Sequence, residues 1–407
     1  MTQADPVRFL DGVRVLDLTT FLSGPFGTQL LSDLGAEVIK VEAAAGDSSR
    51  HIPPHFVSGA SAYFHAVNRN KSSIQLDLKS EKGIEVFLAL VVESDIVMHN
   101  FRPGVMDRLG LTTQRLEEAN PRIVSCSISG FGEYGPRKNI PAYDAMIQAW
   151  AGGMSLTGHP DSPPSRMGLP IGDLAAGMYA ALGSVAAHLS SRATGRGAHI
   201  DVAMFDSQLA LLVYQAVYYM ISHEVPGPQG AGHLSIPTYR SFLCSDDVYV
   251  MITANTEGMW KAMCQVLGLE ELVEDERFVS NATRLENAGE LWALLEPAFA
   301  SRASIQVVEE LLAAGVPAAR VNSVADALDD EQTRARNMVV SLKTHDGESV
   351  DVPGNPIKST GVRPDSEFVA AAPLGSDTAM LLEKLIGLTR NEIAELQSSG
   401  AVGPFGA

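Results

Sequence analysis

Short apolar runs alternate with longer segments of helical periodicity through the N-terminal third of the chain. Runs rich in Val, Ile and Leu are typical of buried strands, at 13–18, 36–42, 72–78, 95–101 and 122–131. Helical segments are predicted between them, at 26–35, 80–94 and 113–121. Strand, helix and strand repeated in this order are typical of parallel βαβ units. The pattern therefore predicts an α/β fold with a Rossmann-like, doubly wound domain.

A different pattern follows residues 224–238, which are rich in Gly and Pro and mark a boundary. Beyond them, alternation over 241–255 predicts a hairpin. Helices are expected at 257–267, 282–300 and 303–314. This part of the chain is therefore expected to be a smaller α+β domain.

Residues 168–189 contain large apolar side chains at helical spacing among Ala and Gly, namely Leu174, Tyr179, Leu182, Val185 and Leu189. The spacing predicts a buried helix with Asp173 in its first turn. A carboxylate at that place is either a helix cap or a reactive group. The N-terminus of a helix is expected to stabilise its ionised form. The local sequence leaves both roles open.

Composition narrows the range of partners. The 407 residues carry a net charge of −18, which argues against nonspecific binding to nucleic acid or anionic membranes. Three widely spaced cysteines predict a reducing compartment, with neither a disulfide framework nor a zinc site. Residues 1–18 lack a signal-peptide pattern, and the longest apolar run, 209–221, predicts a buried helix rather than a membrane span. A cytoplasmic protein without a bound metal is expected.

Several further positions are candidates for ligand binding. Lys71, Arg102 and Arg108 lie near predicted strand ends, where cations can hold phosphates, although solvated surface cations would look the same. A loop and helix start at 127–153 include Tyr143. The Gly-rich segment 227–233 is either a mobile lid or a linker. No GxGxxG follows the first strand, so a dinucleotide site is not predicted.

Taken together, these stretches resemble the family III CoA-transferases, the CaiB/BaiF group that includes formyl-CoA transferase and carnitine CoA-transferase. The resemblance covers nearly the whole chain, and its specificity comes from the order and spacing of many segments. The segments that carry it include LDGVRVLDLTTFLSGPFGTQLLSDLGAEVIKVE, NRNKSSIQLDLKS, HNFRPGVMDRLGL, NPRIVSCSISGFGEYGP, PIGDLAAGMYAALGSVAAHL, VEDERFVSNATRL, AAGVPAARVNSVADAL and PLGSDTAMLLEKLIGL.

The resemblance implies a catalytic role for Asp173, through aspartyl anhydride and aspartyl-CoA thioester intermediates. Coenzyme A would be a substrate rather than a tightly bound cofactor. Residues that match the CoA-contacting stretches of the family are Phe21, Leu22, Ser23, Asn68, Lys71, Asn100, Phe101, Arg102, Arg108, Ile140 and Tyr143. The family's glycine-rich lid matches the segment that contains Gly230, Gly232 and His233, although this chain lacks an unbroken glycine run there.

The resemblance also implies an interlocked, ring-like homodimer. The expected division is a large CoA-binding domain at 1–225, a small domain at 226–328 and a C-terminal segment at 329–407 that returns to the large domain. The expected reaction moves CoA from an acyl-CoA, with succinyl-CoA as one candidate, to a small carboxylic acid. Arg240 could pair with a second carboxylate of that acid or form only a surface salt bridge.

Two other functions remain open. The α-methylacyl-CoA racemases of the same family carry a His where this chain has Tyr143, just before Asp144. A phenol with an ordinary pKa near 10 is a poor base at neutral pH, which favours CoA transfer over racemisation. The second alternative is a non-catalytic CoA-binding protein in which Asp173 only caps its helix.

Overall fold

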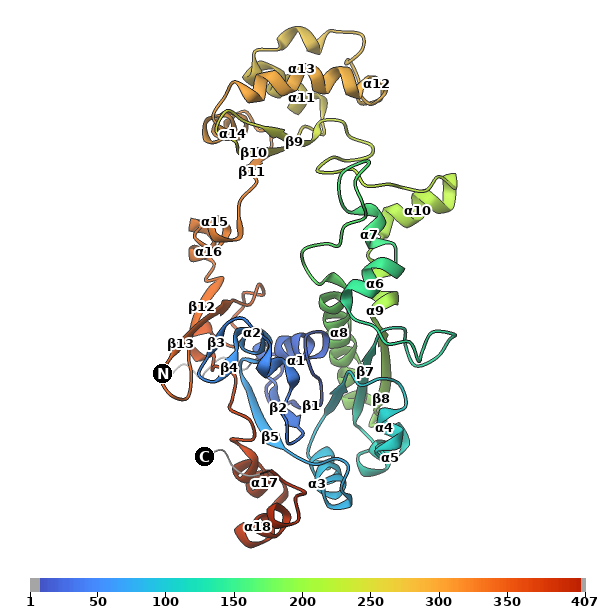
Figure 1. Cartoon of the computed structure of the whole chain (residues 1–407), viewed down its shortest axis with the longest axis vertical. Helices are drawn as coiled ribbons and strands as arrows, with labels where there is room; N and C mark the ends of the chain where they lie inside the picture. The colour runs from blue at the N-terminus through green and yellow to red at the C-terminus, as the bar shows by residue number, and fades with distance from the viewer. Residues whose placement is uncertain (1–7, 404–407) are drawn as a thin grey trace. The chain divides into compact units, whose positions relative to one another are not determined.

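The computed structural model describes residues 8–403 and divides them into two compact units (Figure 1). The first unit contains residues 8–153, 166–223 and 331–403, and the second contains residues 154–165 and 224–330. Residues 154–165 belong to the second unit, although the expected division placed them in the large domain. Residues 1–7, part of the segment examined for a signal peptide, lie outside the described residues.

A parallel sheet forms the centre of the first unit, as the βαβ pattern predicts. Its order is β5-β2-β1-β6-β7-β8, and every neighbouring pair is parallel. The strands are Arg14–Asp17 (β1), Glu37–Glu42 (β2), Lys71–Gln75 (β5), Ile96–His99 (β6), Val124–Ser129 (β7) and Ala198–Ala203 (β8). In chain order this is the doubly wound arrangement, with its switch point between β1 and β6. Strand β8 was not predicted from the hydrophobic pattern.

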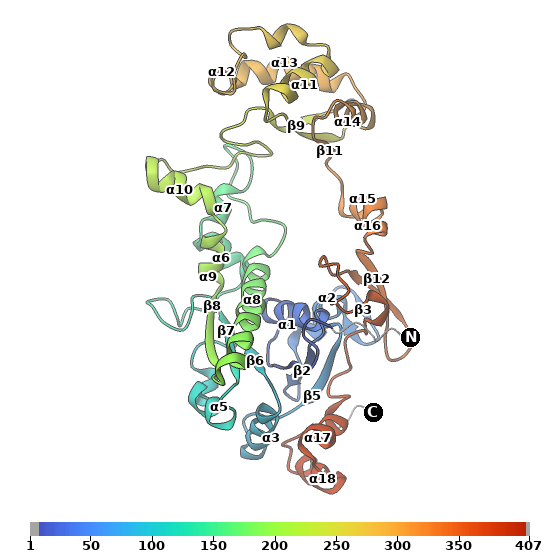
Figure 2. The same cartoon turned by 180° about the vertical axis from the view of Figure 1, so that it is seen from behind.

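Helices cover both faces of this sheet (Figures 1 and 2). One face packs against the helices α1 (Ser23–Asp33), α6 (Asp144–Trp150) and α8 (Ile171–Thr194). The other face packs against α3 (Glu81–Val92), α5 (Thr113–Ala119), α17 (Thr378–Ile386) and α18 (Arg390–Ser398). The C-terminal helices thus complete the core of the first unit.

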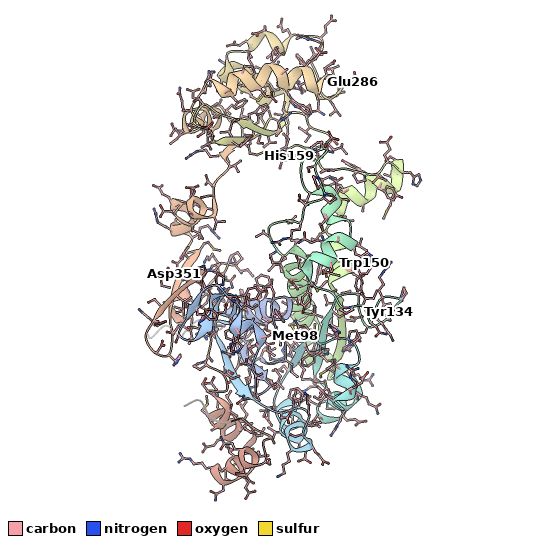
Figure 3. The ribbon with its side chains drawn as sticks, in the orientation of Figure 1. Met98, Tyr134, Trp150, His159, Glu286 and Asp351 are labelled. Carbon is pink, nitrogen blue, oxygen red and sulfur yellow. The ribbon has the colours of Figure 1, made fainter. Side chains whose placement is uncertain are left out.

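Strand side chains alternate between these two layers. Val15 and Met98 belong to the core beneath α1 and α8, and Figure 3 labels Met98 in β6. Leu16 and Val97, their neighbours in sequence, belong to the core beneath α3 and α17. Helices bury both faces of the sheet, which explains why the strands are continuous apolar runs in the sequence rather than an alternating pattern.

The helices α1 and α8 cross with their backbones in contact. A Cβ added to Gly27 would lie 2.8 Å from the carbonyl oxygen of Gly177, and one added to Gly177 would lie 2.5 Å from the carbonyl oxygen of Ser23. Only glycine at both positions permits this approach. The crossing fixes the first turn of α8, with Asp173, beside the first turn of α1.

The prediction that the large apolar side chains of α8 are buried is wrong. The helix buries Ala, Gly and Ser instead, while Leu182 and Leu189 are 67% and 64% exposed. Small residues form the inner face because the backbones approach so closely. Tyr179, Leu182 and Leu189 are left on the outer face, whereas Val185 packs partly against the core.

The apolar run 209–221 is likewise not a buried helix. It spans the end of α9 (Met204–Ala210) and most of α10 (Val213–Ser222), and α10 buries none of its side chains in the chain as described. Figure 2 shows α10 standing away from the sheet of its unit. Hydrophobicity alone could not distinguish a core helix from a helix with an apolar outer surface.

The second unit contains the predicted hairpin and helices. Strands Tyr239–Leu243 (β9) and Tyr249–Thr253 (β10) pair antiparallel, and Ala318–Arg320 (β11) joins β10. Its helices are α11 (Glu257–Leu267), α12 (Asn281–Glu286), α13 (Ala288–Ala300), α14 (Ser304–Ala313) and α15 (Val324–Leu328). Helices α11, α13 and α14 share a core with β9 and β10 that includes Trp260, Phe242 and Phe299. This unit therefore has its own hydrophobic core.

Short elements complete the first unit. They are β3 (Phe56–Val57), β4 (Ala60–Ser61), α2 (Ala62–Asn68), α4 (Val105–Arg108), α16 (Glu331–Ala335), β12 (Val339–Lys343) and β13 (Ser349–Pro353), and α7 (Gly153–Leu156) lies at the boundary with the second unit. None of the helices within residues 8–403 is long and apolar enough to cross a membrane.

Candidate active site

The loops that follow β1 and β6 meet at the switch point of the sheet, where α/β proteins bind ligands. Asn100, directly after β6, joins them. Its Oδ1 accepts a hydrogen bond from the Thr20 amide at 2.8 Å, and its Nδ2 donates to the Thr20 carbonyl at 2.7 Å. The same Nδ2 lies 3.4 Å from the Ser23 hydroxyl oxygen. Asn100 therefore fixes the loop that leads into α1.

Asp173 is the third residue of α8 and does not cap it. The Gly172 amide donates at 2.8 Å to Oδ1 of Asp144, the first residue of α6. Gln148 donates at 2.7 Å to the other oxygen of Asp144 and holds that carboxylate in place. Asp144 therefore accepts a hydrogen bond from the first turn of α8, as a capping residue does. The Asp173 carboxyl interacts with the Ser23 side chain instead.

The electrostatic environment of Asp173 differs from the expectation. Burial and the nearby negative charge of Asp144 raise the pKa of Asp173 to about 7, against a hydrogen bond from Ser23 that lowers it. The helix start was expected to stabilise the ionised form, whereas burial and the charge of Asp144 shift this carboxyl toward its protonated form. A carboxyl with so perturbed a pKa in a ligand-binding region is typical of functional sites.

Tyr63, on α2, is a neighbour of Asp173 that could not be identified from the sequence. Burial, followed by the charges of Asp173, Asp47 and Asp144, raises the pKa of Tyr63 to about 12. The phenol is therefore neutral over the physiological range and retains its proton. No motif surrounds it, so only the fold places it near Asp173.

Two aromatic rings mark the outer part of this region. Phe21 has a φ of 63°, a left-handed conformation that is unfavourable for a bulky residue, and its amide donates at 3.2 Å to Asp47. Its ring meets that of Tyr143 edge to face, with 6.1 Å between centroids. They are 37% and 64% exposed. Leu22 is half-buried at the start of α1, and Ile140 is exposed in the loop before α6.

The side chains of Asn68 and Lys71 are buried in a hydrogen-bond network of the first unit, and their role as CoA contacts stays a prediction. Lys71 is 4% exposed and its ammonium donates to Asp17 at 3.0 Å, to the Pro25 carbonyl at 2.9 Å and to Asn68 at 2.9 Å. Asn68 in turn donates to the Phe64 carbonyl at 3.0 Å. Burial lowers the pKa of Lys71 to about 8, although Asp17 opposes that effect. In the described structure these buried hydrogen bonds stabilise the end of β1 and the first turn of α1.

Arg102 and Arg108 are exposed and line a cavity of about 430 Å³ in the first unit. Lys138, which the sequence analysis did not single out, lines it as well. The cavity also contains His99, whose pKa is lowered by burial to about 4. Phe101 is half-buried, and its ring stacks on His99 at 5.7 Å. The lining offers these three cations to an anionic ligand, beside the carboxylates of Asp107 and Glu133.

The candidate lid residues Gly230, Gly232 and His233 lie in the second unit. The Gly230 amide donates at 2.8 Å to the Gly158 carbonyl, and the His233 ring stacks on Tyr239 at 5.5 Å. Closure of this segment over Asp173 stays a prediction. Among residues 8–403, no group of His, Cys, Asp and Glu side chains has the geometry to hold a metal ion.

The pKa of Asp173 leads to a prediction about pH. If the reaction needs an ionised Asp173, kcat/KM should rise with pH along an acid limb centred near 7, because the raised pKa keeps the carboxyl protonated below that value. Asp144→Asn should move the limb to lower pH by removing a like charge. The matched control Asp11→Asn, at an exposed site, should leave it unchanged. An Asp144→Asn profile identical to that of the natural chain would contradict the assignment.

Comparison with known proteins agrees with this geometry. The sequence matches the profile of CoA-transferase family III over residues 10–378. It is 40% identical to an acetyl-CoA:oxalate CoA-transferase of Acetobacter aceti, over 93% of this chain and 96% of that protein. It is 34% identical to a succinyl-CoA:glutarate CoA-transferase of Mus musculus, over 98% and 92%. A crystal structure of a CaiB/BaiF family protein from Brucella suis superposes with a TM-score of 0.83, at 37% identity over 93% of this chain and 100% of that one. The chain is a member of CoA-transferase family III.

Proposed function

We propose that this family member moves CoA from an acyl-CoA to a small carboxylic acid, with Asp173 as the nucleophile. The observation that carries the proposal is the state of the Asp173 carboxyl. It lies at the start of α8 beside Ser23, does not accept the capping hydrogen bond from Gly172, and has a pKa near 7. A carboxyl that is costly to ionise and is not used as a cap is available for chemistry.

In the first half-reaction, an Asp173 oxygen attacks the thioester carbonyl of the donor. The carbon–sulfur bond breaks, the CoA thiolate leaves, and a mixed anhydride joins Asp173 to the donor acyl group. The thiolate then attacks the aspartyl carbonyl. This step releases the donor acid as a carboxylate and leaves an aspartyl-CoA thioester. One negative charge is present before and after each step.

The second half-reaction runs the same steps in reverse with the acceptor. The acceptor carboxylate attacks the aspartyl thioester, which expels the thiolate and forms a second anhydride. The thiolate attacks the acceptor acyl carbon, and Asp173 leaves as a carboxylate. Each covalent intermediate is open to hydrolysis, so the burial around Asp173 serves to exclude water.

Neighbouring groups have supporting roles in this proposal. Ser23 donates to the carboxylate and orients it, while Asn100 fixes the loop that carries Ser23. Tyr63 retains its proton and adds no charge to a site that already holds Asp144. These contacts hold Asp173 in place between chemical steps.

The cavity beside β6 is proposed as the site for the phosphates of CoA, because Arg102, Arg108 and Lys138 line it together. Arg108→Gln should raise the dissociation constant of CoA about tenfold, as loss of one charge-assisted hydrogen bond does. Titration calorimetry of the full chain measures this. Arg115→Gln, on α5 and outside the cavity, is the matched control. Equal affinities for the natural chain and Arg108→Gln would contradict this placement.

Small dicarboxylic acids are the proposed acceptors, since the similar enzymes named above act on oxalate or glutarate. The experiment is a matrix of acyl-CoA donors, including acetyl-CoA and succinyl-CoA, against carboxylic acids, with products read by mass spectrometry. The proposal predicts new acyl-CoA species that appear only when both a donor and an acid are present. Consumption of acyl-CoA without any new thioester would contradict it.

Racemisation is the competing function, and the same incubations test it. An epimerase would incorporate deuterium from heavy water beside the thioester without a free acid. Tyr143, 64% exposed at the position of the racemase His, favours transfer. We therefore expect no deuterium uptake when the acid is omitted.

A homodimer is proposed because two helices of the single chain expose large apolar side chains. Leu182 and Leu189 of α8 and Ile221 of α10 are 67%, 64% and 76% exposed, and a partner chain would cover them. Light scattering should give twice the 43.4 kDa chain mass, and a monomer at micromolar concentration would contradict the proposal. The three free, buried cysteines suit a reducing compartment such as the cytoplasm.

A further inference from the structure

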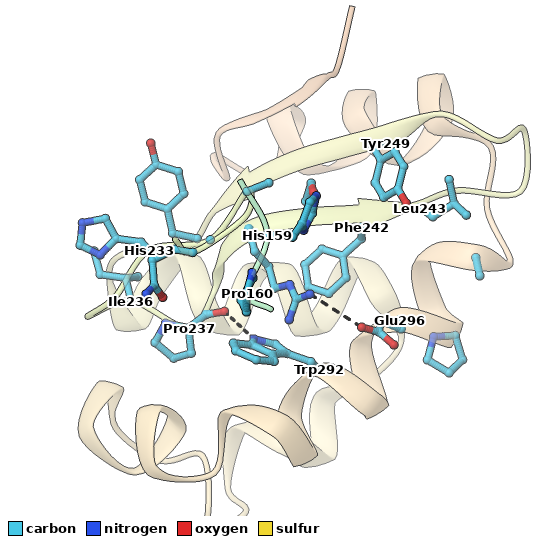
Figure 4. A pocket seen from close by; sticks show the side chains of 18 residues that line it. His159, Pro160, His233, Ile236, Pro237, Phe242, Leu243, Tyr249, Trp292 and Glu296 are labelled. Atoms are coloured by element: carbon cyan, nitrogen blue, oxygen red, sulfur yellow. Dashed lines mark hydrogen bonds and ion pairs between the residues drawn. The ribbon is translucent and has the colours of Figure 1, made fainter. Parts of the chain in front are cut away.

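The second unit contains a cavity of about 630 Å³ that the proposed chemistry does not use (Figure 4). Strand β9 forms one wall and helix α13 the other. Arg240 and Phe242 point to the same side of β9 because they are two residues apart. Trp292 and Glu296 share a side of α13 because they are four residues apart. The Arg240 side chain therefore lies between a strand and a helix.

Aromatic rings enclose the Arg240 guanidinium. Its central carbon lies 4.1 Å from the ring centroid of Trp292 and 5.4 Å from that of Phe242. The indole of Trp292 donates at 2.9 Å to the Pro237 carbonyl, which fixes the ring (Figure 4). Phe242 is fixed in turn by stacking on Phe299 at 4.5 Å. The cage is thus rigid before any ligand enters.

The N–H groups of this guanidinium lack a hydrogen-bond acceptor among the described residues. Its one ion pair, with Glu296, has an N–O distance of 3.9 Å, which is too long for a hydrogen bond. The Glu296 side chain is 60% exposed and can turn into solvent, whereas that of Arg240 is 26% exposed. A guanidinium that is partly shielded from water and lacks a protein acceptor gains from pairing with an anion.

We propose that this cavity binds a small organic acid through its carboxylate, with Arg240 as the receptor and the aromatic wall covering the carbon chain. The rings cover the guanidinium face, so the in-plane N–H fork remains for a planar carboxylate. The apolar lining includes Ile236, Pro237 and Tyr249, which an organic acid covers and a bare inorganic anion does not. The choice of an organic acid as the ligand rests on the proposed function. The geometry around Arg240 is independent of that function.

The test is titration calorimetry of the full chain with glutarate, without any acyl-CoA. Arg240→Gln should weaken binding about ten- to a hundredfold, the cost of a lost charged hydrogen bond. Arg240→Lys, which keeps the charge but not the fork, should fall between. Glu296→Gln should tighten binding, because it removes the competing carboxylate. The control Arg277→Gln, at an exposed arginine paired with Asp275 and Glu290, should leave binding unchanged.

The fluorescence emission of Trp292 reports binding at this cavity. Its contribution is the part of the glutarate-dependent change in emission that is absent from Trp292→Phe. If Arg240 only stabilises the packing of α13 on β9, Arg240→Gln will lower the unfolding temperature without changing the affinity for glutarate, and the proposal is overturned. Tighter binding of inorganic phosphate than of glutarate, lost in Arg240→Gln, would overturn the carboxylate assignment. Repeating the titration in Asp173→Asn separates the proposals, since binding there does not depend on a working nucleophile.

Discussion

Asp173→Asn is expected to abolish CoA exchange, with kcat/KM lower by about 10⁴-fold or more, as removal of a covalent nucleophile does. The amide has nearly the same size and can still accept a hydrogen bond from Ser23, but it cannot form the anhydride. Steady-state exchange with an acyl-CoA and a carboxylic acid measures the loss. CoA affinity should be unchanged, because the proposed phosphate site near Arg108 is not altered.

Stability separates a catalytic effect from a damaged fold. The pKa of Asp173 is raised in the folded chain from 3.8 to about 7, so the native state binds more protons than the unfolded state between these values. The free energy of unfolding therefore falls as pH rises through that window. Asp173→Asn avoids this cost and should unfold at the same or a higher temperature than the natural chain at pH 8. An inactive variant with a clearly lower unfolding temperature would point to misfolding instead.

Gly177→Ala is expected to have the second largest effect, although residue 177 makes no contact with substrate in the proposed mechanism. Its new Cβ would lie 2.5 Å from the Ser23 carbonyl and 3.2 Å from the Gly27 nitrogen, both backbone atoms that cannot turn aside. Separation of α1 from α8 should cost about 1–3 kcal/mol of unfolding free energy. It should also move Ser23 relative to Asp173, and a displacement of this kind can lower kcat about 10²-fold.

Gly183→Ala is the matched control on the same helix. Its Cβ would lie 3.4 Å or more from Ile200, which is ordinary contact, so the gain in helix propensity of about 1 kcal/mol should dominate. Thermal unfolding and exchange kinetics of both variants test the comparison. If both variants behave alike, the close crossing does not position Asp173.

The layout of the first unit could be predicted from sequence because the apolar runs and helical segments alternate strictly. The strand β8 was missed because Ala198–Ala203 contains His199 and Asp201 and lacks a continuous apolar run. The outer face of α8 was misassigned for a different reason. Helical periodicity identifies an apolar stripe, but it does not show whether the rest of the same chain covers that stripe. In α8 the small residues form the inner face instead.

The site was predictable in part. Ser23 and Asn100 lie together because the loops after β1 and β6 meet at the switch point, and Ser23 also lies beside Asp173, whereas the roles assigned to these residues stay predictions. The burial of Lys71 could not be predicted, because in sequence a cation at a strand start looks the same whether it faces a ligand, solvent or a buried Asp17. Asp144 acts through space on Asp173, and Asp173 acts on Tyr63, but the sequence positions of these residues do not predict that they lie close together.

The most direct test of the nucleophilic role of Asp173 is to trap its acyl intermediates. The enzyme is incubated with acyl-CoA, treated with hydroxylamine, digested and analysed by peptide mass spectrometry. We expect a hydroxamate on Asp173 that requires acyl-CoA and is absent from Asp173→Asn. Exchange at the normal rate, with every peptide containing Asp173 unmodified, would contradict the account.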